Sequence, residues 1–129
     1  MNNKRYKLEV SSEQLKIIIN CVEDCHRFLC GQMELSNTTQ VLDERIKMRE
    51  SLSKLKDLVT PYQDGIEYNW SGHDCPNKSQ KKLIGATYYL YREIQHLWTL
   101  LQNSKDWNVY KSPTLRCENS GEPIKLDEI

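Results

Sequence analysis

Residues 77–103 read NKSQKKLIGATYYLYREIQHLWTLLQN and carry two adjacent apolar stripes at helical spacing. The first stripe consists of Leu83, Leu90, Ile94, Leu97 and Leu101. The second stripe lies one residue further round the helix and consists of Ile84, Tyr88, Tyr91 and Trp98. Side chains three or four residues apart share one helix face, so the two stripes form one broad apolar surface. The pattern predicts a central helix over 77–103, with Leu90 and Ile94 in the middle of the core.

Three segments begin with a short polar residue that is followed three positions later by glutamine. These pairs are Ser11 with Gln14, Asn37 with Gln40, and Asn77 with Gln80. A polar side chain at an N-cap accepts a hydrogen bond from a free backbone N–H, and glutamine three residues on reaches back to the cap. The pairs therefore predict helix starts at the beginning of 11–34, 38–59 and 77–103.

Helical spacing of apolar residues supports the first two of these helices as well. The stripe of 11–34 is Leu15, Ile18, Val22, Cys25 and Leu29, and that of 38–59 is Val41, Met48, Leu52, Leu55 and Val59. Each helix is thus expected to bury one face. Three amphipathic helices in 129 residues predict a mainly α fold, a three-helix bundle that forms a single domain.

The two ends of the chain alternate apolar and polar residues, which is typical of strands. Residues 5–10 predict one short strand. Residues 106–129 contain the turn-rich stretch 118–122 between two alternating segments. Two interpretations of this C-terminal segment stay open: a hairpin that forms a small antiparallel sheet with the first strand, or an irregular tail that lies on the bundle.

The stretch 21–30, CVEDCHRFLC, contains three cysteines, one histidine and two carboxylates. A structural zinc site takes four ligands, and Cys21, Cys25, His73 and Cys75 are one such set. Packing is the favoured interpretation, because Cys25 falls within the apolar stripe and free cysteine behaves as a small apolar side chain. We therefore predict neither a metal nor another cofactor.

Catalytic motifs are incomplete in this sequence. Residues 72–79, GHDCPNKS, depart from the phosphate-binding pattern GxxxxGK[ST], because Asn77 replaces its second glycine. Cys25 and His26 are adjacent and diverge by about 100° on a helix, so they do not form a nucleophile and base pair. The ExxE and ExxD motifs of all-helical nucleotide hydrolases do not occur. We predict no catalytic residue, and a metal-dependent phosphate-ester or nucleotide hydrolase is the alternative.

The 60–76 segment is long for a connection between helices, and such loops are often functional. Its bulky apolar residues are Tyr62, Ile66, Tyr68 and Trp70. Recognition surfaces favour tyrosine and tryptophan, which combine a large contact area with a hydrogen-bonding tip. We predict that Tyr68, Trp70 and His73 border a surface that binds another macromolecule, and that Asp74 braces the loop. In the competing interpretation, Trp70 closes the end of the bundle.

Lysines crowd the predicted start of the helix over 77–103. Lys78, Lys81 and Lys82 lie where free backbone N–H groups and the helix dipole already favour anions. Lys78 and Lys81 are the candidate anion-binding residues, and three solvated lysines are the alternative.

Charge and composition exclude several classes of function. Eighteen basic residues balance eighteen acidic ones, so no overall field attracts the chain to nucleic acid or to an anionic membrane. No apolar run approaches the roughly 20 residues that span a bilayer. The first ten residues, MNNKRYKLEV, lack the apolar segment of a secretory signal. The chain has five cysteines, and an odd number cannot all pair in disulfides within one chain. Together with the missing signal segment, this predicts a reducing location, the cytoplasm.

Three stretches resemble a known group of proteins: VEDCHRF at 22–28, WSGHDCPN at 70–77 and YYLYRE at 88–93. They are similar to small uncharacterised proteins carried by phages and mobile elements of gut bacteria. The resemblance implies no enzymatic activity and favours an accessory protein that binds a partner. The sequence thus predicts a non-enzymatic interaction protein with a protein partner, and homo-oligomer formation stays open.

Overall fold

The computed structural model describes residues 4–63 and 70–101. The helices in this part of the chain are α1 (Ser12–Leu29), α2 (Ser36–Thr39), α3 (Arg45–Ser53), α4 (Lys56–Val59) and α5 (Lys78–Leu101). The mainly α prediction is therefore confirmed. None of the helices in these two ranges is long and apolar enough to cross a membrane. The predicted location in the cytoplasm stays a prediction.

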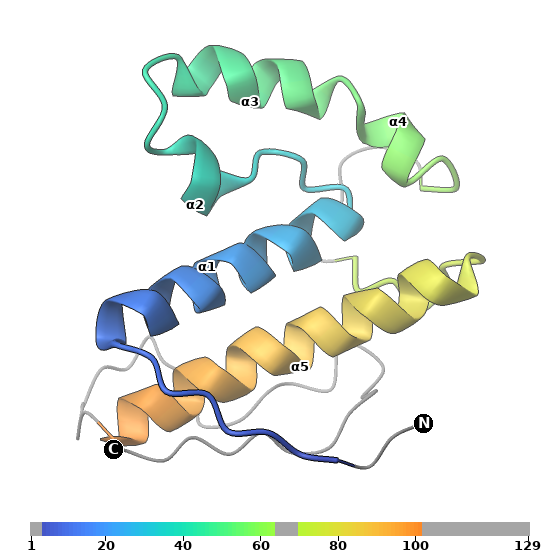
Figure 1. The fold of residues 1–129 in the computed structure, drawn as a ribbon. Coiled ribbons are helices and arrows are strands. Elements are labelled where there is room, and N and C mark those ends of the chain that lie inside the picture. Colours follow the sequence, from blue (N-terminus) through green and yellow to red (C-terminus); the bar gives the residue numbers. More distant parts are fainter. Residues whose placement is uncertain (1–3, 64–69, 102–129) are drawn as a thin grey trace.

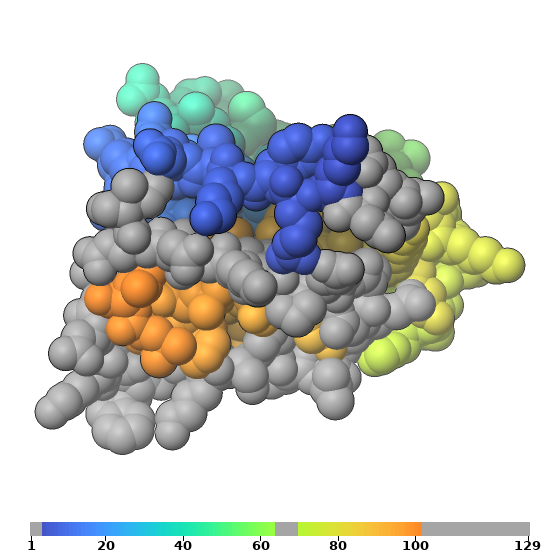
Figure 2. All heavy atoms as spheres, turned by 60° about the horizontal axis from the view of Figure 1, so that its bottom comes forward, coloured from blue at the N-terminus to red at the C-terminus, as the bar shows by residue number. Residues whose placement is uncertain are grey.

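The predicted strand over 5–10 is wrong, because the structure assigns no strand to these residues. Tyr6 and Leu8 are 85% and 75% exposed, and the segment runs along the surface of the molecule (Figure 2). A strand needs a neighbouring strand for its backbone hydrogen bonds, and no strand occurs anywhere in 4–63 or 70–101. The C-terminal segment 106–129 lies outside the described residues, and so does the predicted hairpin.

α1 and α5 lie side by side and hold the core between them (Figure 1). The core cluster is formed by Cys30, Ile84, Tyr88 and Tyr91. The residues packed around it are Val22, Leu29, Trp70 and Tyr89. Burial raises the pKa of the Tyr91 hydroxyl to about 12, and the nearby Glu23 carboxylate adds to the shift. The neutral phenol is therefore the form that the core favours.

α5 faces the core with its second apolar stripe. Ile84, Tyr88 and Tyr91 are buried, whereas Leu90 is 36% exposed, so the prediction that Leu90 lies at the centre is wrong. Ile94 is buried as predicted, at 8% exposure. Two tyrosine rings carry more apolar area than leucine side chains, so turning this stripe inward removes more surface from water.

α1 is turned by one residue in the same way. Ile19, His26 and Cys30 are buried, whereas Cys25 is exposed, contrary to the predicted stripe. His26 Nδ1 lies 2.9 Å from the carbonyl oxygen of Ile84 and donates to it, since a carbonyl only accepts. This hydrogen bond lets a polar ring occupy a core position.

The capping box predicted at Ser11 is present in full. Ser11 Oγ accepts from the backbone N–H of Gln14 at 3.1 Å, and Gln14 Oε1 accepts from the N–H of Ser11 at 2.9 Å. The predicted cap at Asn37 is wrong. α2 instead follows Leu35, which takes a left-handed conformation with φ of 47°, and no side chain at this position caps the helix.

The cap predicted at Asn77 is present, but Gln80 does more than the pattern indicates. Asn77 Oδ1 accepts from the N–H of Gln80 at 3.1 Å. The Gln80 side chain donates to the carbonyl oxygens of Leu29 and Val59, each at 3.0 Å. These carbonyls end α1 and α4, where helical partners are lacking. Gln80 therefore ties the ends of α1 and α4 to the start of α5.

The continuous helix predicted over 38–59 is wrong, because α2, α3 and α4 occupy this region with turns between them. We name residues 40–59 the α3–α4 arm. α3 lies on the opposite side of α1 from α5 (Figure 1), and no residue of α3 or α4 is buried. The three-helix bundle predicted from the sequence is therefore not what the described residues form: the core is made by α1 and α5.

Candidate functional site

The predicted loop surface is partly described. Tyr68 lies outside the described residues, and His73 is exposed. Trp70 is half-buried and packs against the core cluster, and its indole N–H donates to Asp74 Oδ1 at 2.6 Å. Asp74 thus braces the loop as expected. The packing of Trp70 against the core cluster favours the competing interpretation, although the three-helix bundle whose end it was to close is not confirmed.

The rest of this loop is also fitted to the core. Gly72 has φ of +77°, and a Cβ added there would lie 2.8 Å from Cδ1 of Ile84, so the position requires glycine. The Tyr62 hydroxyl lies 3.0 Å from the sulfur of the buried Cys75. Desolvation raises the pKa of Tyr62, and the hydrogen bond to Cys75 raises it further. These contacts make residues 70–76 a closure of the core.

The candidate zinc ligands are not brought together. Cys21 and Cys25 are exposed on α1, whereas Cys75 is a buried residue of the loop. Within 4–63 and 70–101, no three histidine, cysteine or acidic side chains are grouped as a metal site requires. Desolvation raises the pKa of the Cys25 thiol, which opposes the thiolate form that a nucleophile or metal ligand needs.

The candidate anion site lies at the start of α5. Lys78 is exposed and Lys81 is half-buried. The backbone N–H of Gln80 is already bound by Asn77, so one of the donors that an anion would use is occupied. Anion binding at Lys78 and Lys81 stays a prediction.

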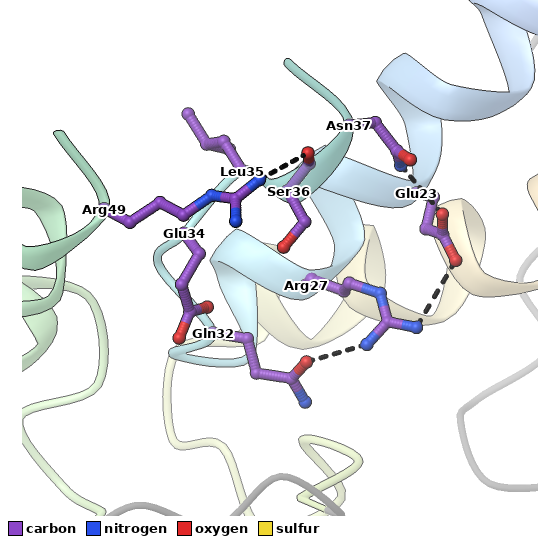
Figure 3. Close-up of a pocket in the computed structure, with 8 residues that line it drawn as sticks. All are labelled: Glu23, Arg27, Gln32, Glu34, Leu35, Ser36, Asn37 and Arg49. Carbon is purple, nitrogen blue, oxygen red and sulfur yellow. Dashed lines mark hydrogen bonds and ion pairs between the residues drawn. The ribbon is translucent and has the colours of Figure 1, made fainter. Parts of the chain in front are cut away.

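A pocket that the sequence patterns do not indicate opens on the other side of α1 (Figure 3). Its volume is about 460 Å³. The residues that line it are Glu23, Arg27, Gln32, Glu34, Leu35, Ser36, Asn37 and Arg49. They come from α1, the following turn, α2 and α3, so no single sequence motif contains them. Seven of the eight lining residues are polar or charged, and they include two arginines and two glutamates.

One arginine and one glutamate of the pocket pair with each other. Arg27 lies 3.3 Å from Glu23 Oε2 and donates to Gln32 Oε1 at 2.9 Å. The other oxygen of Glu23 accepts from the Asn37 side chain at 2.8 Å. Both charges are therefore balanced within the wall, and the side chains that carry them are held in place.

The other two charged side chains are not paired. Arg49 donates to Thr39 Oγ1 at 2.8 Å and to the carbonyl of Ser36 at 3.2 Å, which attaches α3 to α2 without a carboxylate. The Glu34 carboxylate makes no hydrogen bond or ion pair with the described residues, and Figure 3 shows it without a dashed line. Within the described residues, the pocket thus has one arginine and one glutamate that form no ion pair.

The backbone beside Glu34 is strained. Leu35 has φ of 47°, a conformation that costs a non-glycine residue roughly 1–2 kcal/mol. Strained residues of this kind cluster at ligand sites, where the surrounding structure holds them in place.

Comparisons with protein-family models, with curated proteins and with solved structures find no match to this chain, so the resemblance described above stays a prediction.

Proposed function

We propose that this chain is a non-enzymatic protein-binding module and that the α3–α4 arm is its binding surface. The observation that carries the proposal is the set of large apolar side chains that the arm leaves exposed. The arm exposes the large apolar residues Val41 (78%), Leu42 (40%), Ile46 (65%), Met48 (44%), Leu55 (46%) and Leu58 (79%). Exposed apolar side chains gathered on one segment are typical of interaction sites, because covering them removes apolar area from water.

Charge points to the partner's chemistry. The basic residues of the arm are Arg45, Lys47, Arg49, Lys54 and Lys56, and the acidic ones are Asp43, Glu44, Glu50 and Asp57. Because Asp43 and Glu44 precede α3, the surplus of basic residues lies from Arg45 to Val59. The exposed Lys47 and Lys54 flank Met48 and Leu55 in the sequence. An amphipathic helix whose apolar stripe is bordered by acidic side chains complements such a surface. We therefore name an acid-flanked helix of another protein as the partner.

Two other proposals, a binding surface on the 60–76 loop and a metal-dependent hydrolase, have less support. Trp70 packs against the core cluster, which favours the arm over the loop surface of Tyr68, Trp70 and His73. A metal-dependent hydrolase would hold its metal with several carboxylates, and no observation in 4–63 or 70–101 favours such a group.

Three synthetic helical peptides test this proposal. They share one apolar stripe and carry acidic, basic or neutral flanking residues, and their binding is measured by fluorescence anisotropy. We expect the acid-flanked peptide to bind with a dissociation constant of about 1–100 μM, and the basic-flanked peptide at least about tenfold more weakly. Raising the salt concentration should weaken the acid-flanked complex, because screening removes its charge complementarity.

Variants show whether the arm is the site. The double substitution Met48→Ser and Leu55→Ser should abolish peptide binding and leave the melting temperature nearly unchanged, because neither side chain is buried. The matched control is Ile17→Ser, which removes an apolar side chain that is 55% exposed on α1, and it should bind as the unaltered protein does. Equal binding of all three peptides, or full binding by the double variant, contradicts the proposal. If the unaltered protein is a dimer and the double variant is a monomer, the partner of the arm is a second copy of the chain and not another protein.

A further inference from the structure

We infer that the pocket between α1, α2 and α3 binds a small zwitterion, a molecule that carries an ammonium group and a carboxylate as amino acids do. This inference concerns the opposite-charge pocket lined by Arg49 and Glu34 and does not rest on the proposed function of the α3–α4 arm. The pocket volume of about 460 Å³ lies within the range of roughly 300–1,000 Å³ that small-molecule sites occupy.

The charges of the wall select the ligand. Glu23 and Arg27 neutralise each other at 3.3 Å, so their charges do not require a ligand. Arg49 attracts an anionic group and Glu34 attracts a cationic one, and neither has an opposite charge beside it among the described residues. A simple anion would leave Glu34 uncompensated and would also be repelled by it. A simple cation would leave Arg49 without an opposite charge and would be repelled by it.

The wall is prepared for a polar ligand. Arg49 is fixed by Thr39 and Ser36, and Arg27 is fixed by Glu23 and Gln32, so these donors are oriented before a ligand arrives. Such preorganisation lowers the entropy cost of binding. Leu35, which has a left-handed backbone conformation, directly follows Glu34. This conformation fixes the backbone next to the Cα atom of Glu34. The carboxylate of Glu34 stays available for an ammonium group, which donates up to three hydrogen bonds.

A series of amino acids with increasing charge separation tests the inference: glycine, β-alanine and γ-aminobutyrate. Butyrate and butylamine are the singly charged controls for the last of these, and ionic strength is held constant. Binding is followed by chemical-shift changes of the protein's backbone amides. We expect at least one amino acid to saturate with a dissociation constant of about 1 mM or tighter, and both singly charged controls to bind at least about tenfold more weakly.

The substitution Glu34→Gln should lower the affinity at least about tenfold and keep the fold, because the carboxylate makes no hydrogen bond with the described residues. Glu13→Gln on α1 is the matched control outside the pocket, and it should bind as the unaltered protein does. The shift changes should map to 23–37 and to Arg49. The inference is wrong if no amino acid saturates by about 10 mM, if butyrate or butylamine binds as tightly as the best amino acid, or if Glu34→Gln has no effect.

Discussion

Replacing Ile84 with alanine should lower the free energy of unfolding by about 2–5 kcal/mol, through lost burial and the cavity that remains. Ile84 is 0% exposed and belongs to the core cluster between α1 and α5. It also lies next to Gly72, where an added Cβ would meet its Cδ1 at 2.8 Å, so the cavity would open beneath the loop as well as between the helices. Urea unfolding followed by circular dichroism measures the change.

Leu90→Ala is the matched control, because truncation to alanine removes three carbon atoms from leucine and from isoleucine, and both residues lie on α5. Leu90 is 36% exposed, so its truncation should cost less than half as much as that of Ile84. If Leu90→Ala proves as damaging as Ile84→Ala, then α5 packs through its first stripe, and the core described above is incorrect.

Replacing Asp24 with alanine should cost roughly 2–4 kcal/mol, because several donors lose one shared acceptor. Asp24 is buried on α1, at 3% exposure. Its oxygens accept from the backbone N–H groups of Asn37 and Thr38 at 3.1 and 2.8 Å. They also accept from the Asn37 side chain at 3.1 Å and from the Thr38 hydroxyl at 2.6 Å. Asp24 thus supplies from a distance the cap that α2 lacks locally.

Thermal and urea unfolding of Asp24→Ala should be compared with those of Asp43→Ala, which alters an exposed aspartate in the arm. We expect the control to change stability by no more than about 0.5 kcal/mol. Because Asp24 attaches α2 to α1, amide exchange in α2 should accelerate in Asp24→Ala before global unfolding occurs. Two variants of equal stability would show that the Asp24 contacts do not hold α2.

Local patterns in the sequence predict the features that depend on residues close together in the chain, such as a helix cap or a helical period. The Ser11 and Gln14 capping box involves two residues three positions apart, and it is present as predicted. The helical period of 77–103 is also sufficient to predict α5, which the structure describes as Lys78–Leu101. It did not determine which of two adjacent stripes turns inward, because that choice depends on His26 and the tyrosines meeting across the α1–α5 interface.

The short helix α2 and the pocket could not be predicted from the sequence, because both depend on contacts between residues far apart in the chain. Asp24 binds Asn37 and Thr38, and Arg49 binds Thr39, so α2 forms where a longer helix was expected. Tertiary hydrogen bonds override helix propensity because they satisfy buried groups, while propensities differ by only about 0.7 kcal/mol per residue. The pocket follows from the same contacts, and for that reason no motif indicated it.

The central claim is that the α3–α4 arm stays uncovered until a partner binds, and amide hydrogen exchange tests it most directly. With no buried residue in α3, its amides should exchange much faster than those of α1 and α5 in the free protein. Saturation with the acid-flanked peptide should slow exchange in α3 and α4 specifically. The account is contradicted if α3 of the free monomer is already as protected as α5, or if the peptide leaves the exchange of α3 unchanged.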